Sequence, residues 1–594
     1  MSSKRTAVAA AAALLSLGGA VADQPIYTVK SAYAAVANET NGLPQQRFRS
    51  SDIIAPVLQV NTWDKAQTDD SSCLFLSGAY GRHKAAPMIL SGKDLSLVYA
   101  DQQYDEVYAS SVQTLNGTQY LTFWEGPRRG GNSSRADGHW LMYDGTYALQ
   151  FNLTARGSGA IRDDMPAMRV TRDNTVLLPL YETVTADCSA VGGPVDAPLQ
   201  DSGFQEMDPA TNKVVFEWRA REHFDLNASF AQYDAAFGVG SPGGFDFFHL
   251  DSVEKADNGH YLVSSSHFSM LAMVDGQDGH VLWTLGGKHS DFRDVDDGGN
   301  ATDFAWQRDV RMTGPDEITL FDNHVRSTDH CRGPCHSRGL RLRLDHAART
   351  VALVAEWRHP DDGGGGVDAG RMGGVQLLGD GHAVVAWGDN PAFVEYNKAG
   401  QPVLDVQRGV AGAAAGRLER VSRQRWHGAP SWPPSVAVDA PSKSTSGATV
   451  YVSWNGATEV AAWAILASDT ADTVSHYKNV IAHANRTGFE THIALDDAVA
   501  RRYIGAAAMS AAGDVLGASF VYDMHTGKAV MQASGITTIR PPVKATAAAG
   551  AMGGSIFGFS MLFYIGNYFW RKRGAAPSAE EHPSYEKVGG GSAV

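Results

Sequence analysis

The sequence predicts an all-β fold, in which a β-propeller is followed by a smaller β-sandwich. The first observation is a repeated phrase at 208–218, 275–283 and 345–357, in which a polar turn leads into an apolar strand that closes on tryptophan. Repeats of this size are typical of antiparallel blades around a central axis. The second observation is composition, because 63 glycines, 13 tryptophans and 20 tyrosines suit strands joined by tight turns. No long amphipathic helical pattern interrupts the repeats, which disfavours an α/β fold.

The stretch around His249 and His267 shows the repeat most clearly, with one histidine in each of two hairpin patterns. Alternating runs at 260–264, 270–274 and 281–285 are separated by turn signals rich in Asp, Asn and Gly. This arrangement predicts one propeller blade.

The repeats divide the interior of the chain into two domains. We predict the propeller over 47–425, after an N-terminal segment at 23–46. A Pro-Ser-Trp-Pro-Pro linker follows, because clustered prolines interrupt regular structure. Shorter strand patterns then predict a fibronectin- or immunoglobulin-like sandwich over 430–536, with Trp454 and Trp463 as candidate core residues.

Both ends of the chain contain targeting signals. A Lys-Arg pair followed by an Ala/Leu-rich run predicts a signal peptide over 1–22, cleaved before Asp23. The uncharged run at 545–570 is long enough to cross a bilayer, and the basic residues after it predict a cytoplasmic, disordered tail over 571–594. A GPI signal is the alternative, but such signals end in their hydrophobic segment. We therefore expect a single-pass type I membrane protein whose bulk is extracellular or in the secretory-pathway lumen.

Sequons and cysteines fit this topology. We expect glycosylation at seven Asn-x-Ser/Thr sequons between the two hydrophobic segments. They are Asn38, Asn116, Asn132, Asn152, Asn227, Asn300 and Asn485. Cys331 and Cys335 can close a small loop as a disulfide, and Cys73 with Cys188 is then the remaining pairing. A metal site is the alternative for the first pair, since a histidine flanks it on each side.

Two features bear on binding partners. The net charge of −14 argues against nucleic acid, because phosphate binding needs a basic face. Gly550, Gly554 and Gly558 recur every fourth residue of the predicted membrane span and would share one helix face. Self-association through that face is one hypothesis; the alternative is that small residues only fill the span.

Six strings, taken in order, resemble the fungal branch of the arylsulfotransferase family. They are DSGFQEMD (201–208), FDFFHLDSVEK (245–255), VLWTLGGKHSDF (281–292), FAWQRDVRM (304–312), ITLFDNH (318–324) and VYVSWNGATEVAAW (450–463). The resemblance implies a six-bladed β-propeller followed by a small β-sandwich. For the bacterial members it implies sulfuryl transfer from an aryl sulfate to a phenol, through a sulfated histidine and without a nucleotide donor. We therefore expect no cofactor and no metal, and an aryl sulfate, a phenol or another anion as the ligand.

This chemistry needs a neutral imidazole as nucleophile, donors for the sulfonate oxygens, and a group that handles the phenol proton. The sequence departs from the family at four of these positions. Arg308 follows the Trp-Gln phrase where the family has its sulfated histidine, and 164–167 lacks the histidine of an Asp-x-His-Glu phrase. His249 keeps its place in a His-x-Asn pair, but Asp251 replaces the asparagine, and Ser266 replaces an arginine. Guanidinium stays protonated, so Arg308 cannot be the nucleophile.

The surviving candidates each have a structural alternative. His249 and His267 are candidate catalytic residues, or else core histidines bonded to backbone. Arg308 and Asp251 are candidates for binding substrate or another anion, with an ion pair to Asp309 or Asp322 as the alternative for Arg308.

Two further candidates for that binding role, Asn323 and His324, follow a strand end, where a turn would also explain them. The acidic run at 291–300 resembles a cation loop only loosely, and we expect a solvated turn.

Two functions from different classes follow. In the first, the protein is an arylsulfotransferase-like enzyme whose centre is rebuilt around His249. In the second, it is a pseudoenzyme, a propeller without catalysis that binds a ligand, glycan or protein at the outer face of the membrane. The arginine at position 308 favours the second.

Overall fold

The computed structural model describes ten stretches of the chain. They are 23–79, 85–127, 138–156, 168–233, 244–295, 299–324, 336–360, 367–410, 417–497 and 500–533. The predicted signal peptide, membrane span and tail lie outside these residues, as do Gly550, Gly554, Gly558, Cys331, Cys335 and Asn132. Within the ten stretches, no helix is long and apolar enough to cross a membrane.

Antiparallel sheets dominate the described residues, which confirms the predicted all-β class. Six of these sheets have a four-stranded core. Four of them use consecutive strands: β8 (Glu106–Leu115), β9 (Thr118–Gly126), β10 (His139–Tyr143) and β11 (Leu149–Leu153); β12 (Arg169–Val170), β13 (Val176–Ala186), β14 (Ala197–Asp208) and β15 (Lys213–Arg219); β17 (Leu250–Lys255), β18 (Tyr261–Ser265), β19 (Met270–Val274) and β20 (Val281–Gly286); and β22 (Arg308–Gly314), β23 (Glu317–Asp322), β24 (Arg338–Asp345) and β25 (Thr350–Trp357). Short parallel strands extend two of them, β16 (Phe245–Asp246) beside β14 and β21 (Arg293–Asp294) beside β25.

Each of the other two sheets combines strands from the N-terminal part of the ring region with strands from its C-terminal part. One contains β26 (Gly374–Leu377), β27 (Ala383–Ala386), β28 (Ala392–Tyr396) and β29 (Pro402–Gln407), and adds β4 (Leu58–Trp63) and β1 (Ile26–Tyr27) at its outer edge. The other places β30 (Val421–Gln424) beside β5 (Cys73–Ala79), β6 (Ala85–Ser91) and β7 (Leu97–Ala100). Segments distant in sequence therefore share both sheets.

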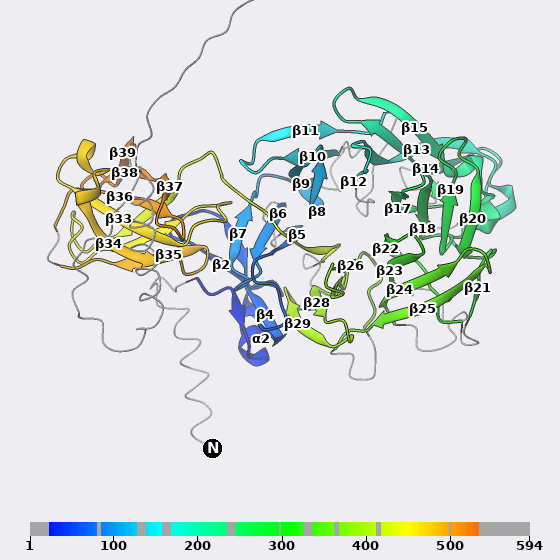
Figure 1. The fold of residues 1–594 in the computed structure, drawn as a ribbon, viewed down its shortest axis with the longest axis horizontal. Helices are drawn as coiled ribbons and strands as arrows, with labels where there is room; N and C mark the ends of the chain where they lie inside the picture. Colours follow the sequence, from blue (N-terminus) through cyan, green and yellow to red (C-terminus); the bar gives the residue numbers. More distant parts are fainter. Residues whose placement is uncertain are drawn as a thin grey trace, which may run out of the picture. The chain divides into compact units, whose positions relative to one another are not determined.

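One strand from each of the six sheets lies in a central ring, and the arrangement is propeller-like. Strand β8 contacts β30 and β12, β13 contacts β17, β17 contacts β22, and β26 contacts both β22 and β30. The sheets follow one another around this ring in sequence order, from β5–β7 in blue through β17–β20 in green to β26–β29 in yellow-green (Figure 1). We call β8, β12, β17, β22, β26 and β30 the inner strands. Because β30 supplies the inner strand of the sheet that β5–β7 begin, the C-terminal end of this region closes the ring.

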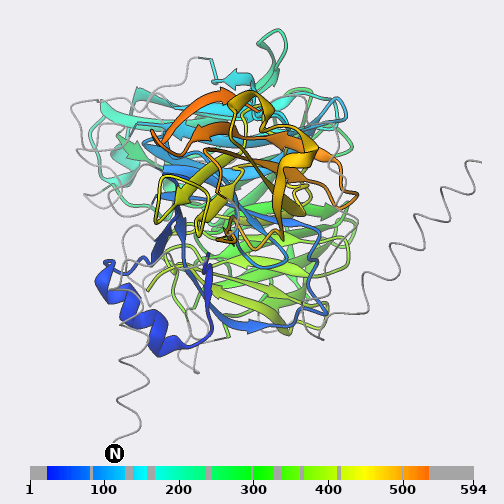
Figure 2. The ribbon, with the colours of Figure 1, turned by 90° about the vertical axis from the view of Figure 1, so that its left-hand side faces the viewer.

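The N-terminal segment packs on the same body. Helix α2 (Lys30–Glu39) buries Tyr33 and Ala37 and is the one α-helix among the described residues (Figure 2). Strand β2 (Gln45–Arg47) pairs with β3 (Ile54–Pro56). Five short 3-10 turns complete the inventory: Ser189–Val191, Ala220–Glu222, Leu226–Ala228, Ala471–Thr473 and Tyr477–Asn479.

Two further sheets follow the prolines and share one apolar core. The first contains β31 (Ser435–Asp439), β32 (Thr449–Ser453) and β35 (Glu490–Ala494). The second contains β34 (Val480–Asn485), β33 (Ala462–Ser468), β36 (Tyr503–Met509), β37 (Val515–Ala518), β38 (Phe520–Asp523) and β39 (Lys528–Gln532). Trp463 is 1% exposed in their shared core, and Trp454 packs against that core and donates from Nε1 to Trp432 O at 2.7 Å. Both predicted core tryptophans are confirmed.

The two hairpins predicted around the histidines are confirmed as β17–β18 and β19–β20. The runs predicted at 270–274 and 281–285 match β19 and all but the last residue of β20, and the run at 260–264 is displaced by one residue. Gly259 adopts φ 86° and Gly279 adopts φ 81° in the turns, a left-handed conformation in which a side chain would be strained.

The predicted pairing of Cys73 with Cys188 is wrong, because the structure holds both as free, buried cysteines. Cys73 begins β5 and belongs to one core cluster, whereas Cys188 follows β13 and belongs to another. Burial raises the pKa of Cys73 to about 11, so the thiol stays protonated and unreactive.

The sequon asparagines in the described stretches, Asn38, Asn116, Asn152, Asn227, Asn300 and Asn485, are all exposed. This leaves them accessible to the glycosylation predicted from the sequence.

Two free buried thiols predict a specific labelling pattern. In the unreduced native protein, an alkylating reagent should leave Cys73 and Cys188 unmodified, and it should modify both after unfolding in denaturant without reductant. Peptide mass spectrometry measures the two states. A Cys73–Cys188 crosslinked peptide would show that the two segments meet, contrary to the structure.

The contacts of Trp218 allow a prediction of how strongly aromatic packing stabilises the ring of sheets. It is 2% exposed, packs on Phe204 and Phe248, and donates from Nε1 to Gly279 O at 3.0 Å. Trp218→Ala should lower the free energy of unfolding by about 3–5 kcal/mol, because it leaves a cavity and an unpaired carbonyl. Val215→Ala on the same strand is the control: Val215 is 51% exposed, and its change should stay within about 0.5 kcal/mol in the same urea titration.

Candidate functional site

The candidate site lies where the inner strands β17 and β22 begin. Three inner strands carry a register shift near their start, and beside it a non-glycine residue with positive φ: Ala109 (56°) in β8, His249 (53°) before β17 and Asp309 (51°) in β22. Positive φ is strained for these residue types, and bulges of this kind redirect side chains near functional sites.

His249 is held between a carboxylate and a guanidinium. Its Nδ1 lies 2.6 Å from Asp246 Oδ2, and its Nε2 lies 3.0 Å from Arg308 Nη1. Guanidinium can only donate, so Nε2 accepts that hydrogen bond. The proton of the neutral ring is therefore on Nδ1 and is donated to Asp246, an arrangement that fixes the tautomer.

Arg308 is also paired to Asp251. Arg308 Nη1 donates to Asp251 Oδ1 at 3.2 Å, and Asp251 Oδ2 accepts the backbone N–H of Asp309 at 2.8 Å. The structure thus brings the three candidates His249, Asp251 and Arg308 together. The ion pair of Arg308 is with Asp251 rather than with Asp309 or Asp322.

His267 lies beside His249 but makes different contacts. Its ring centre is 4.6 Å from that of His249 and 4.7 Å from that of Trp306, and its Nδ1 donates to Asp246 O at 2.6 Å. Burial lowers the pKa of His267 to about 3, although the Asp246 carboxylate opposes that shift. The ring is therefore neutral at physiological pH.

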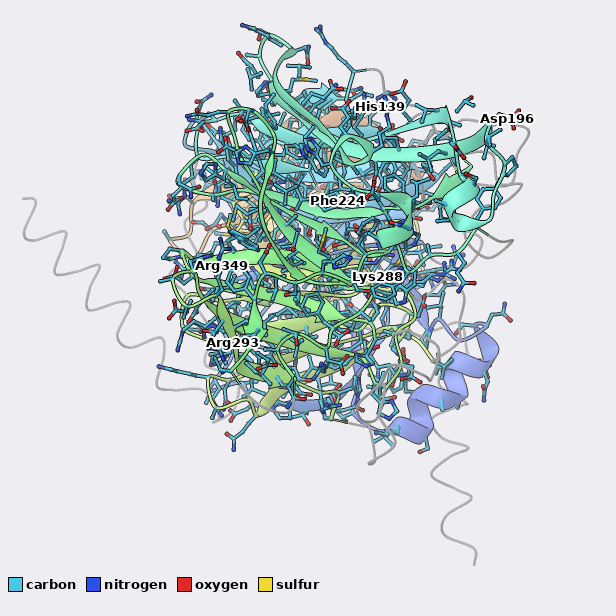
Figure 3. The ribbon with its side chains drawn as sticks, turned by 90° about the vertical axis from the view of Figure 1, so that its right-hand side faces the viewer. His139, Asp196, Phe224, Lys288, Arg293 and Arg349 are labelled. Atoms are coloured by element: carbon cyan, nitrogen blue, oxygen red, sulfur yellow. The ribbon has the colours of Figure 1, made fainter. Side chains whose placement is uncertain are left out.

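Contacts of the neighbouring residues Gln307 and Phe248 hold the segments that carry Arg308 and His249. Gln307 donates from Nε2 to Ser264 Oγ at 3.0 Å and to Ser265 O at 2.9 Å, which fixes the segment before Arg308. Behind His249, Phe248 stacks on Phe224 at 5.3 Å between ring centres; Figure 3 labels Phe224.

Asn323 and His324 belong to a separate set of contacts at the end of β23. Asn323 Nδ2 donates to Met372 O at 2.9 Å, and His324 Nδ1 lies 3.1 Å from Asp322 Oδ2. Asp322 also accepts from Arg338 Nε at 2.9 Å. These contacts join β23 to β24 and to the segment before β26.

Asp246, His249 and His267 are close enough to hold a metal ion. As arranged they do not fit one, because both Nδ1 atoms carry protons that are donated to Asp246. The Arg308 guanidinium 3.0 Å from His249 would also repel a cation. A second group, at Asp275, Asp278 and His280, lies in the partly exposed β19–β20 turn.

A buried ionic cluster beside Arg308 was not predicted from the sequence. Asp309 contacts Arg311, lies 3.0 Å from Arg420 Nε and lies 3.8 Å from Arg169 Nη2. Burial alone would raise the pKa of Asp309, but the guanidiniums of Arg311, Arg420 and Arg169 outweigh it and hold the pKa below its usual value. These arginines are far apart in sequence and belong to no common motif. The one indication of the cluster in the sequence was Arg311, which follows Arg308 by three residues on the same strand.

Two neighbours complete this cluster. Gly374 begins β26, and a Cβ there would lie 2.5 Å from Asp309 Oδ2, so the close approach requires glycine. Glu419 Oε2 accepts the N–H of Ala109 at 2.9 Å, and burial raises the pKa of Glu419 to about 7 although Arg420 acts in the opposite direction. Four inner strands, β8, β12, β22 and β26, and the segment that leads into β30 therefore meet at this cluster.

The model of one protein family, described as arylsulfotransferase (ASST), matches residues 111–409, about half of the chain. The chain belongs to the arylsulfotransferase family. No curated protein matches it.

Solved structures with similar folds are distant. A protein of unknown function from Bacteroides caccae is 13% identical over 60% of this chain and 99% of its own, with a TM-score of 0.35. The β-propeller domain of Cps50 (Swd1) from Myceliophteria thermophila is 10% identical over 62% of this chain and 88% of its own, with a TM-score of 0.29. Scores this low indicate nothing about activity.

By the resemblance described under Sequence analysis, Arg308 stands where a sulfated histidine would be expected. In the structure that arginine donates to the surviving histidine, His249. Ser266, which stands where the family has an arginine, is buried and donates to Gln307 O at 2.9 Å. The site of this family member therefore combines one fixed histidine with a cation in the nucleophile's place.

Glu419 predicts a pH dependence of stability. Its pKa rises from 4.5 to about 7 on folding, so the folded protein binds the proton more tightly. The free energy of unfolding should therefore fall between pH 4.5 and 7 and stay low above that range. Glu419→Gln removes the free-energy cost of ionising a buried carboxyl group. It should stabilise the protein by about 1–3 kcal/mol at pH 8, with little effect near pH 4.5.

Urea titrations at pH 4.5, 6 and 8 measure this difference. Glu182→Gln is a control at a half-exposed carboxylate paired with Arg219. A Glu419→Gln variant that is less stable than wild type at pH 8 would show that the carboxylate is stabilising when ionised, against the expectation.

Proposed function

We propose that this arylsulfotransferase-family protein is a binding propeller that takes an organic sulfate ester, or a similar oxyanion, at Arg308. The observation that carries the proposal is the 3.0 Å contact between Arg308 Nη1 and His249 Nε2. A nucleophilic imidazole must present a lone pair to sulfur, and here that lone pair accepts a hydrogen bond from a permanent cation.

The surroundings of Arg308 suit recognition of an anion. Guanidinium matches the oxygens of a sulfate group through parallel N–H donors. The four guanidiniums of Arg308, Arg311, Arg420 and Arg169 gather around two carboxylates, Asp251 and Asp309. A sulfate ester would exchange with Asp251 for Arg308, and the neutral ring of His267 would not oppose it.

The same proposal includes the finer architecture. The six sheets of the ring would be the blades of a six-bladed β-propeller, and the two sheets after the prolines an immunoglobulin- or fibronectin-like sandwich. The resemblance to the fungal branch supports this arrangement. The ends of the sequence support a single-pass type I protein, glycosylated and facing the cell exterior or the secretory lumen, in which the span at 545–570 would carry the Gly550, Gly554 and Gly558 face.

A second candidate is sulfuryl transfer itself, favoured by the Asp246–His249 pair. Asp246 fixes the tautomer and would stabilise a His249 that becomes positively charged. Once Arg308 turned to the sulfate, Nε2 would attack sulfur, the sulfur–oxygen bond of the ester would break, and the phenolate would leave with a proton from solvent. The oxygen of a phenol acceptor would then attack the sulfuryl group, the nitrogen–sulfur bond to His249 would break, and the phenol proton would pass to solvent.

Binding of 4-nitrophenyl sulfate tests the proposal. Calorimetric titration of the purified full-length protein should give saturable binding at low ionic strength. Arg308→Gln should weaken it about 10- to 100-fold, because it removes a charge-assisted hydrogen bond worth about 1.5–3 kcal/mol. The matched control is Arg343→Gln, an arginine 60% exposed on β24 and paired with Glu317, which should change affinity less than about twofold.

The two candidates separate in a turnover assay. We expect no release of 4-nitrophenol with a phenol acceptor present. Release that His249→Ala abolishes would establish the transfer reaction instead, and binding that is insensitive to Arg308→Gln would remove the proposed site.

A further inference from the structure

A cavity lies at the other end of the strands that carry the His249 site. It has a volume of about 840 Å³ and is lined by Lys255 and Thr313, near the carboxyl ends of β17 and β22. His249 and Arg308 lie at the amino ends of the same strands. Strands of six or seven residues span roughly 20 Å, so the cavity is separate from the His249 site.

One wall of this cavity is apolar. It is formed by Met273 of β19, Leu282 and Trp283 of β20, and Met312 of β22. Cavities of about 300–1,000 Å³ are typical of small-molecule sites, although more than half of the residues that line this one are polar or charged. Trp283 offers an aromatic face against which a planar body can pack.

Arg169 supplies the polar end of the cavity. Its Nη2 is 3.8 Å from Asp309, but that carboxylate is closer to Arg311 and Arg420. Within the described stretches Arg169 Nε is buried and has no hydrogen-bond partner, and the same holds for Thr313 Oγ1. An acceptor group on a ligand would therefore meet the guanidinium of Arg169, which lines the cavity, rather than these two buried atoms.

The other cations of the wall already have close counter-ions. Arg172 Nη1 lies 2.5 Å from Asp257 Oδ1, and Lys255 Nζ lies 2.8 Å from Asp173 and 2.9 Å from Glu206. Arg169 differs from both because its ion pair, with Asp309 at 3.8 Å, is longer and shared with two nearer arginines. The Glu254 carboxylate also stabilises the charge of Arg169.

The remaining charged groups of the wall are also engaged. Glu254 Oε2 accepts the N–H of Met312 at 2.6 Å, and His346 Nε2 lies 3.7 Å from Asp316 Oδ1. The ligand that complements this cavity therefore has one acceptor group for Arg169 and an apolar body.

We propose that this cavity is a second ligand site for an organic anion with an aromatic or aliphatic body. The oxyanion lies against the Arg169 guanidinium, and the body packs on Trp283 and Leu282. This site goes beyond the proposed function, because neither His249 nor Arg308 contributes to it. Arg169 is the one residue common to this cavity and to the arginines around Asp309.

Fluorescence titration with 8-anilinonaphthalene-1-sulfonate tests this site on the purified full-length protein. Because the probe is an aromatic sulfonate that the Arg308 site would also take, the titration starts from the Arg308→Gln variant. In that variant we expect saturable, one-site binding that Arg169→Gln weakens at least about tenfold, the loss expected for one charge-assisted hydrogen bond. Arg172→Gln is the matched control, since Arg172 lines the same cavity but is paired with Asp257, and it should change affinity less than twofold.

Unchanged affinity in Arg169→Gln, or binding that does not saturate, would overturn the proposal. If Arg169→Gln fails to fold by circular dichroism, Leu282→Asp provides the second test, because it places a carboxylate on the apolar wall and should weaken binding by a similar factor; unchanged affinity there would also overturn it. Failure of the Arg308 site would show in the 4-nitrophenyl sulfate titration and leave the Arg169 dependence intact, so the two proposals fail separately.

Discussion

Asp309 connects parts of the ring that are distant in sequence. Its carboxylate contacts Arg311 on its own strand, Arg420 just before β30 and Arg169 on β12, and its amide donates to Asp251. Arg420 reaches this position only when β30 completes the sheet begun by β5–β7. Removing one partner from a buried ion group typically costs about 3–5 kcal/mol, so closure of the ring and order in the cluster support each other.

The same cluster determines what the candidate site can do. Asp251, held by the Asp309 amide, positions Arg308, and Arg308 in turn occupies His249 Nε2. A member of the arylsulfotransferase family that had a histidine at 308 would present a further imidazole beside His249 and His267. With arginine we propose that the group binds an anion, and the positive φ values at His249 and Asp309 direct both side chains toward one point.

The fold was largely predictable because its signals are local. The turns at Gly259 and Gly279 and the alternation in β17–β20 lie within one stretch of sequence. His249, Asp251 and Arg308 were all candidate site residues from the resemblance, but the pairing of Arg308 with Asp251 was not predictable, because the two lie on different strands. The arginines around Asp309 were not predictable either, because Arg169 and Arg420 approach only through ring closure. The pairing of Cys73 with Cys188 failed for the converse reason, since counting cysteines says nothing about which core each one enters.

The central claim is that Arg308, by holding His249 Nε2, makes this a binding site and not a centre that forms sulfohistidine. A crystal structure of the protein soaked with 4-nitrophenyl sulfate tests it most directly. The account predicts an intact ester whose sulfate oxygens accept from Arg308, with no bond from sulfur to His249. A sulfuryl group bonded to His249 Nε2, with Arg308 turned away from the ring, would contradict it.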